Sequence, residues 1–97
     1  MRRAAKIDAN QPEIVGALRE VGASVAITSA VGDGFPDLVV GFRGFNFLME
    51  IKDGTKPPSA RKLTDDQIEF HADWLGSLCV VKTIDEALVA IGVKVAP

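Results

Sequence analysis

The stretch of residues 34–52, GFPDLVVGFRGFNFLMEIK, constrains the fold of this chain more than any other segment. Two apolar runs flank Arg43 and Gly44, which is the pattern of a β-hairpin whose strands are joined by a tight turn. With the turn at these two residues, strand pairing places Asp37 opposite Glu50, and their Cβ atoms are then ~5 Å apart on one face of the sheet. A one-residue change of register would send the two carboxylates to opposite faces.

Asp37 and Glu50 lie in apolar strands, where burying an unpaired charge is costly. Two carboxylates this close repel each other unless a positive charge lies between them. Lys52 follows Glu50 by two residues, so strand alternation puts it on the same face. Mg²⁺ prefers oxygen ligands, commonly one or two protein carboxylates and several waters. The pattern therefore predicts a divalent-cation site with a lysine beside it, as a phosphodiesterase requires.

A simpler interpretation of the same residues stays open at this point. Asp37 follows Pro36 and can be a turn residue, while Glu50 can form an exposed ion pair with Lys52. Exposed ion pairs are common in proteins and contribute little to stability. Spacing alone does not decide between the ion pair and the cation site.

Length and composition indicate one globular domain spanning residues 1–97. Hydrophobic residues make up 47% of the chain, which excludes wholesale disorder. Cys79 is the one cysteine, so it cannot form an intramolecular disulfide, and its apolar neighbours predict a buried thiol. No apolar run approaches the ~20 residues of a membrane span. We therefore expect a cytoplasmic protein without a membrane segment, either bacterial or encoded by a phage in its host.

Charge is distributed unevenly along the chain, although the net charge is −2. Residues 1–62 hold nine of the eleven basic residues and seven of the thirteen acidic ones, whereas residues 63–97 hold two basic and six acidic residues. A bound cation would mask carboxylates in the first part and make the local field more positive there. Ordinary scatter of surface charge would give a similar distribution. Residues 1–9 are a basic lead-in that we expect to be mobile.

Residues 11–21 are expected to form the first helix, because apolar residues recur there at helical spacing. Asn10 precedes this segment as an N-cap, and Pro12 is tolerated in a first turn. Glu13 has two possible roles. It is the third residue after Asn10 and could complete a capping box, or it could point from the edge of the apolar stripe toward the sheet. The stripe comprises Ile14, Val15, Leu18 and Val21.

A second helix is expected to begin within the sequence LTDDQ, with Thr64 as N-cap and Gln67 completing a capping box. His71 lies four residues after Gln67 on the same helical face, where it could touch phosphate or be a half-exposed structural histidine. Apolar residues at helical spacing give this helix a face to bury, namely Ile68, Ala72 and Leu75.

The remaining segments complete an α/β fold. Residues 24–29 and 77–81 read as strands, residues 53–62 as a basic loop, and residues 84–91 as a third helix after an N-cap at Thr83. The resulting order is αβββαβα, in which an antiparallel hairpin joins a mixed central sheet flanked by helices. The hairpin strands are apolar on both faces, which predicts that the sheet is covered on both sides.

The hairpin motifs resemble those of the PD-(D/E)XK nuclease superfamily. Pro36 and Asp37 match its PD, and Glu50, Ile51 and Lys52 match its final triplet after a gap of 12 residues. GFPDLVVG, a strand ending in EIK, a basic loop and a helix opening LTDDQ follow in the order of the virus-type replication-repair nuclease (VRR-NUC) group. The resemblance covers nearly the whole chain and implies a restriction-endonuclease-like core.

The resemblance implies a DNA endonuclease that depends on Mg²⁺ or Mn²⁺. Asp37, Glu50 and the carbonyl of Ile51 would bind the metal, and Lys52 would position or activate the attacking water. Glu13 corresponds to the acid on the family's first helix, which makes a metal-site role as reasonable as the capping role. The glutamine on the helix after the motif is matched by Gln67, whose use in the capping box competes with a role in the site.

Small stand-alone members of this group are similar to Holliday junction resolvases, which implies a homodimer acting on branched DNA. Cutting a junction symmetrically takes two sites related by a two-fold axis. Two alternatives are a DNA-binding accessory module of the same fold without independent cleavage, and an interaction protein with a structural divalent-ion site. The candidates for contacts to the DNA backbone are Arg43, Lys56, Arg61 and Lys62.

Overall fold

The fold is built on one four-stranded mixed sheet, which a computed structural model describes within residues 7–96. Residues 1–6 of the expected lead-in, and Pro97, lie outside the described residues. The elements are α1 (Gln11–Glu20), β1 (Ser24–Ile27), β2 (Leu38–Phe42), β3 (Phe45–Ile51), the 3-10 helix η1 (Pro58–Ala60), α2 (Asp65–Asp73), β4 (Leu78–Val81) and α3 (Ile84–Ala90). This α/β fold has the order expected from the sequence.

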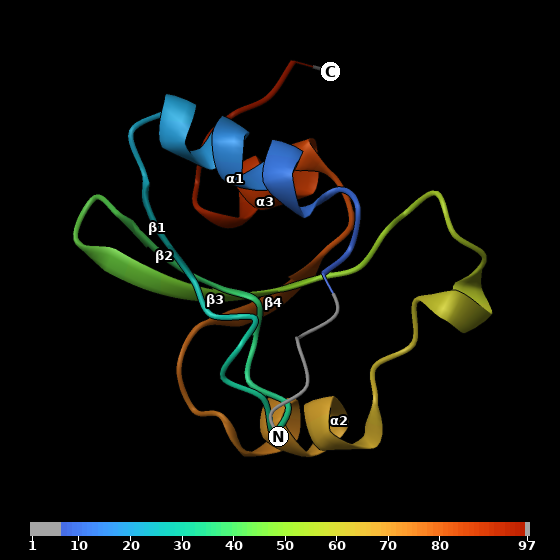
Figure 1. The fold of residues 1–97 in the computed structure, drawn as a ribbon. Coiled ribbons are helices and arrows are strands. Elements are labelled where there is room, and N and C mark those ends of the chain that lie inside the picture. The colour runs from blue at the N-terminus through green and yellow to red at the C-terminus, as the bar shows by residue number, and fades with distance from the viewer. Residues whose placement is uncertain (1–6, 97) are drawn as a thin grey trace.

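The strands lie in the order β1-β2-β3-β4 (Figure 1). β1, β2 and β3 pair antiparallel, and β4 runs parallel to β3. A parallel neighbour requires a crossover connection, and the segment containing η1 and α2 provides it. The sheet is therefore mixed, as expected, with β1 and β4 at its edges.

The hairpin turn lies where the sequence predicts it. Arg43 (φ 50°) and Gly44 (φ 84°) both have positive φ, as a two-residue type I′ turn requires. From Phe42 the pairing continues without a bulge to the first residue of β2. Asp37 directly precedes β2, so the same register carries it opposite Glu50. The predicted register is confirmed.

The core lies between the sheet and the helices α1 and α3, which are side by side on one face (Figure 1). Each fully buried aliphatic side chain contributes about 1.5–3 kcal/mol, so this face supplies most of the hydrophobic stabilisation. Val21 departs from the expected stripe of α1, because it ends the helix and stays 37% exposed. The side chains with no exposed surface are Ile14, Leu18, Leu38, Val40 and Met49.

The helix α2 lies on the other side of the sheet from α1 and α3 (Figure 1), and it packs on the strands less closely than they do. No residue of α2 is buried, and its expected apolar face is wrong: Ile68 is 53% exposed and Leu75 is 99% exposed. The physical reason is that the helix ends at Trp74, so Leu75 falls outside the helical repeat. Phe70 holds the helix instead, with ring centres 5.4 Å from Phe35 and 5.2 Å from Trp74.

Gly34 is the point at which the loop before β2 meets α2. Its φ is +80°, and a Cβ at this position would collide with the carbonyl of Asp66 and lie 2.9 Å from the backbone nitrogen of Gln67. Gly32 has a similar φ of +82° but open space where its Cβ would lie. The close approach at Gly34 therefore fixes the first turn of α2 against the hairpin.

We predict that Gly34→Ala lowers the free energy of unfolding by about 2–4 kcal/mol, because it adds a collision to the strain of positive φ. Gly32→Ala is the matched control, since it carries the strain without the collision and should cost about 1 kcal/mol. Urea denaturation measures both values. Equal losses in the two variants would contradict close packing of this loop on α2.

Candidate functional site

A hollow of about 270 Å³ lies where the start of β2, the end of β3, the basic loop and the N-terminus of α2 meet. We call it the hairpin site. The side chains of Asp37, Glu50 and Lys52 share it, as the register and strand alternation predict. Its other polar and charged lining residues are Asp8, Lys56, Lys62, Thr64 and Gln67.

Asp37 is held at both carboxylate oxygens. The backbone N–H of Ile51 donates to its Oδ2 at 2.8 Å, and the hydroxyl of Ser29 lies 3.4 Å from its Oδ1. The N–H and C=O of a strand residue point toward the same neighbouring strand, so the Ile51 carbonyl also faces the Asp37 side. This orientation suits the third ligand that the resemblance implies.

Glu50 is buried, with 3% of its surface exposed, and its Oε1 has no hydrogen-bond partner within residues 7–96. Burial first, and then the neighbouring Asp37 carboxylate, raise the pKa of Glu50 from 4.5 to about 9, although Lys52 opposes the shift. Without a cation the carboxyl group therefore keeps its proton at neutral pH. An exposed Glu50–Lys52 ion pair, the simpler interpretation of the sequence, is wrong.

Gln67 connects Glu50 to Lys52. Its Nε2 donates to Glu50 Oε2 at 3.1 Å, and its Oε1 accepts from Lys52 Nζ at 2.9 Å. The same Oε1 accepts from the N–H of Thr64 at 2.9 Å, and the Thr64 hydroxyl accepts from the Gln67 N–H at 3.3 Å, which completes the capping box. An amide oxygen has two lone pairs, so one side chain serves the cap and the site together. The expected competition between these roles does not occur.

The oxygen donors of the hairpin site fit a hard divalent cation. Asp37, Glu50 and the Ile51 carbonyl offer the donor type that Mg²⁺ prefers, and Mg²⁺ usually retains waters in its remaining positions. Among the described residues no three His, Cys, Asp or Glu side chains are grouped closely enough to hold a metal by themselves. The donor set therefore differs from the closed cage of a structural zinc site. A cation would give the buried Glu50 Oε1 the partner it lacks.

Glu13 does not line the hairpin site. It is exposed and lines a different hollow, together with Asp53 and the residues that open α3. The capping role is also wrong, because Asn10 has helical backbone angles and its side chain makes no cap hydrogen bond. The Asn10 Nδ2 donates instead to the carbonyls of Lys52 (3.1 Å) and Lys82 (3.0 Å), which joins the ends of β3 and β4. The metal-site role of Glu13 is left without support.

Two polar residues near the start of α1 reach the site region instead. Asp8 lines the hairpin site and forms an ion pair of 3.6 Å with Lys56. Gln11 is 3% exposed and hydrogen-bonds to Ser29. No sequence pattern marks Asp8, because it falls in the lead-in that was expected to be mobile. Gln11 could have been found, since it precedes Leu18 by seven residues and so lies on the buried stripe.

The four basic candidates for DNA contacts separate into two pairs. Lys56 and Lys62 line the hairpin site. Arg43 lies in the turn between β2 and β3, at the far end of β2 from Asp37 and ~20 Å of strand away. Arg61 is half-buried and does not line the hairpin site. Its Nε is buried without a hydrogen-bond partner in the described part of the chain. The structure therefore brings together two of the four residues.

His71 lies near the hairpin site but outside its wall. Burial lowers the pKa of His71, and the positive charge of Lys52 lowers it further, so the imidazole is neutral at pH 7. Its Nε2 is buried and finds no hydrogen-bond partner among residues 7–96. A half-buried, neutral ring agrees with the structural interpretation better than with a phosphate contact.

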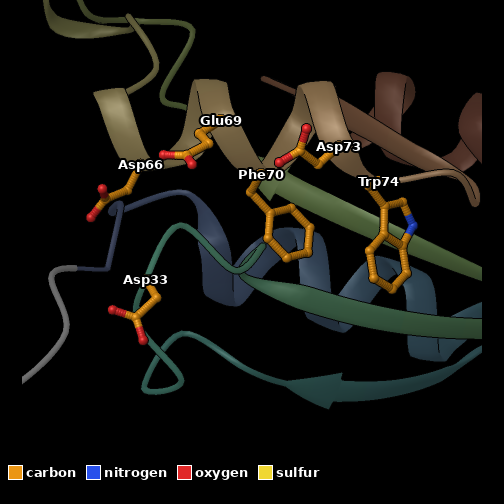
Figure 2. A pocket seen from close by; sticks show the side chains of 6 residues that line it. All are labelled: Asp33, Asp66, Glu69, Phe70, Asp73 and Trp74. Carbon is orange, nitrogen blue, oxygen red and sulfur yellow. The ribbon is translucent and has the colours of Figure 1, made fainter.

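A second hollow, of about 370 Å³, lies on a different face of α2 (Figure 2). Figure 2 shows carboxylates along the helix and Asp33 on the loop before β2. Among residues 7–96, four acidic side chains line it and no basic one does, so their field repels anionic groups. The lining residues are Asp33, Asp66, Glu69, Phe70, Asp73 and Trp74.

Two further expectations concern Cys79 and the membrane. Cys79 is half-buried rather than fully buried, and burial raises the pKa of its thiol. Its Sγ lies 3.7 Å from the carbonyl of Leu48. Within residues 7–96, no helix has the length and apolarity needed to span a bilayer.

Comparisons of the chain with protein-family models, with curated proteins and with solved structures found no match. The chemistry of the hairpin site therefore has to be inferred from its own side chains. The informative ones are the buried Glu50, the half-buried Asp37 beside it, and Lys52, which Gln67 joins to Glu50.

We predict that the metal-free protein loses stability as the pH rises from about 5 to about 9. The pKa of Glu50 is about 9 when folded and 4.5 when unfolded, so the folded state binds the extra proton in this window. The protonated Glu50 contributes its full stabilisation below the pKa of the unfolded protein. This stabilisation is lost as the pH rises through the pKa of the folded protein. Glu50→Gln has no carboxyl group at this position to titrate. Over the same pH range, its melting temperature should therefore fall by at least about 5 °C less than that of the parent protein.

Differential scanning calorimetry across this pH range measures both profiles. If the hairpin site binds a divalent cation, added Mn²⁺ should reverse the trend for the parent, because the cation would displace the proton of Glu50 and bind more strongly at high pH. Parallel profiles for Glu50→Gln and the parent would contradict a raised pKa of Glu50.

Proposed function

We propose that this chain is a metal-dependent endonuclease that hydrolyses phosphodiester bonds in DNA with Mg²⁺ or Mn²⁺. The observation that carries the proposal is the meeting of Asp37, Glu50 and Lys52 in one hollow, with Gln67 joining the last two. The resemblance to the PD-(D/E)XK motif and the VRR-NUC group supports the same roles at the same residues.

Asp37, Glu50 and the Ile51 carbonyl would hold the cation, which would offset the negative charge of the scissile phosphate. Lys52 Nζ donates one N–H to Gln67 and has two more for a water or a phosphate oxygen. Water attacks phosphorus in line with the leaving oxygen. A new bond forms between the water oxygen and phosphorus, and the bond to the leaving oxygen breaks. The attacking water gives up one proton to the solvent, and the leaving oxygen takes one up. No covalent intermediate with the protein is involved.

Lys56 and Lys62 are the proposed contacts to the DNA backbone. Both line the hairpin site, and the acidic hollow of Figure 2 lies on another face of α2. Ammonium–phosphate contacts position DNA without reading its sequence, which suits selection by DNA structure. Lys56 would exchange its ion pair with Asp8 for a phosphate. Arg43 is too far along the hairpin to share this contact.

Branched DNA such as a Holliday junction is the proposed substrate, and a homodimer in the cytoplasm is the proposed assembly. Two cuts placed symmetrically in a junction require two sites related by a two-fold axis. The exposed apolar side chains Ile68 and Leu75 offer surface that a second copy could cover.

A DNA-binding module without cleavage of its own is the second candidate. The observation that favours it is that, in the part of the chain that the structure describes, no three metal-binding side chains are grouped. Both candidates predict that the chain binds DNA. Only the endonuclease predicts that DNA is cut.

We predict that the purified protein cuts four-way junction, flap or linear duplex DNA in the presence of Mg²⁺ or Mn²⁺. Lys52→Ala should lower the initial rate of cleavage by about 100-fold or more, because it removes the ammonium group that would face the phosphate. Lys94→Ala, an exposed lysine outside the hairpin site, is the matched control and should cut at the parental rate. If no DNA is cut, or if Lys52→Ala is as fast as the parent, the endonuclease proposal fails. Binding without cutting would favour the accessory module.

We predict that the double variant Lys56→Ala/Lys62→Ala binds a labelled junction about 10-fold more weakly at low salt and lowers the slope of log affinity against log salt by about 2. Arg43→Ala removes the same kind of charge at the far end of the hairpin and should change affinity by less than about 2-fold. Fluorescence anisotropy over a range of salt concentrations measures both. A loss for Arg43→Ala as large as that of the double variant would place DNA across the hairpin turn instead.

A further inference from the structure

Asp37 is connected to α1 through two polar side chains. The Nε2 of Gln11, the first residue of α1, donates to Ser29 Oγ at 3.2 Å. Ser29 Oγ in turn lies 3.4 Å from Asp37 Oδ1. Ser29 follows β1 and Asp37 precedes β2, and the backbone N–H of Thr28 donates to the Asp37 carbonyl at 2.8 Å. The pairing of β1 with β2 therefore continues up to the residues that make this connection.

The direction of the connection follows from the number of protons available. The Ser29 hydroxyl has one proton, and its oxygen lies 3.4 Å from both Gln11 Oε1 and Asp37 Oδ1. A hydrogen bond to a carboxylate is stronger than one to a neutral amide. Since the Gln11 Nε2 already donates to the Ser29 oxygen, the hydroxyl proton goes to Asp37. The chain thus runs from the Gln11 amide through the Ser29 hydroxyl to Asp37.

Burial makes Gln11 an unusual residue in this chain. Gln11 and Glu50 are the two buried polar or charged residues in the part of the molecule that the structure describes. Burying an amide is unfavourable unless it is hydrogen-bonded, and an apolar residue at this position of α1 would avoid that cost. Ile14 and Leu18, with no exposed surface, fix α1 against the sheet. The Gln11 amide therefore has a fixed position from which to orient Ser29.

We propose that Gln11 and Ser29 are positioning residues that fix the Asp37 carboxylate for cation binding. The Ile51 N–H holds one carboxylate oxygen and the Ser29 hydroxyl holds the other, so rotation of the carboxylate is opposed at both atoms. Groups that orient a metal ligand in this way affect metal affinity without touching the metal. The inference rests on the proposed function, because it takes the hairpin site to bind a divalent cation.

Isothermal titration of the full chain with Mn²⁺ alone, without DNA, tests this inference. Ser29→Ala should lower Mn²⁺ affinity by about 10-fold, and Gln11→Leu by about 3-fold, because its effect passes through Ser29. Ser29→Thr keeps the hydroxyl and should retain the parental affinity. Ser24→Ala changes an exposed serine of β1 and is the matched control with no expected change. Calorimetric melting without cation shows whether each variant is folded.

The outcomes separate this inference from the proposed function. If the parent binds Mn²⁺ and cuts DNA while Ser29→Ala binds Mn²⁺ as tightly, the positioning role is overturned and the function stands. If the parent neither binds Mn²⁺ nor cuts DNA, both are overturned. If Ser29→Ala does not fold, Ser29→Cys replaces it, because a thiol keeps the shape but donates weakly, and the same loss is expected.

Discussion

The closeness of two carboxylates at the ends of β2 and β3 is the constraint on which the rest of the structure depends. Asp37 and Glu50 cannot both be ionised at this separation without a compensating charge. Their neighbours reduce the cost: the Ile51 N–H holds one acid and the Gln67 amide holds the other. The apolar core on the opposite face of the sheet stabilises the fold enough to offset the rest of this unfavourable free energy. The polar site and the apolar core are thus two faces of one hairpin.

The hairpin could be predicted because the information for it is local. A turn at Arg43 and Gly44 and a strand period of two are sufficient to count from the turn to Asp37 and Glu50. The caps of the second and third helices were equally visible, because each needs only a threonine and a polar residue three positions later. Lys52 joined the site by the same counting.

The rest of the site depends on contacts between distant segments, which no local pattern records. Asn10 looked like a helix cap, but its amide joins carbonyls 42 and 72 residues further along the chain. Glu13 and Gln11 are two residues apart on α1, so the rotation of the helix decides which one turns toward the sheet. The face of α2 that packs against the rest of the protein is likewise decided by a distant contact, between Phe70 of the helix and Phe35 of the loop before β2.

The capping box of α2 couples helix formation to assembly of the site. Gln67 fixes the first turn through Thr64 and joins Glu50 to Lys52 with the same amide. No residue of α2 is buried, so this helix can open locally at a smaller free-energy cost than the core elements. Each opening of the first turn removes the Gln67 amide from its hydrogen bonds to Glu50 and Lys52. The free energy of fraying at one helix end therefore sets the fraction of time that Glu50, Gln67 and Lys52 are joined.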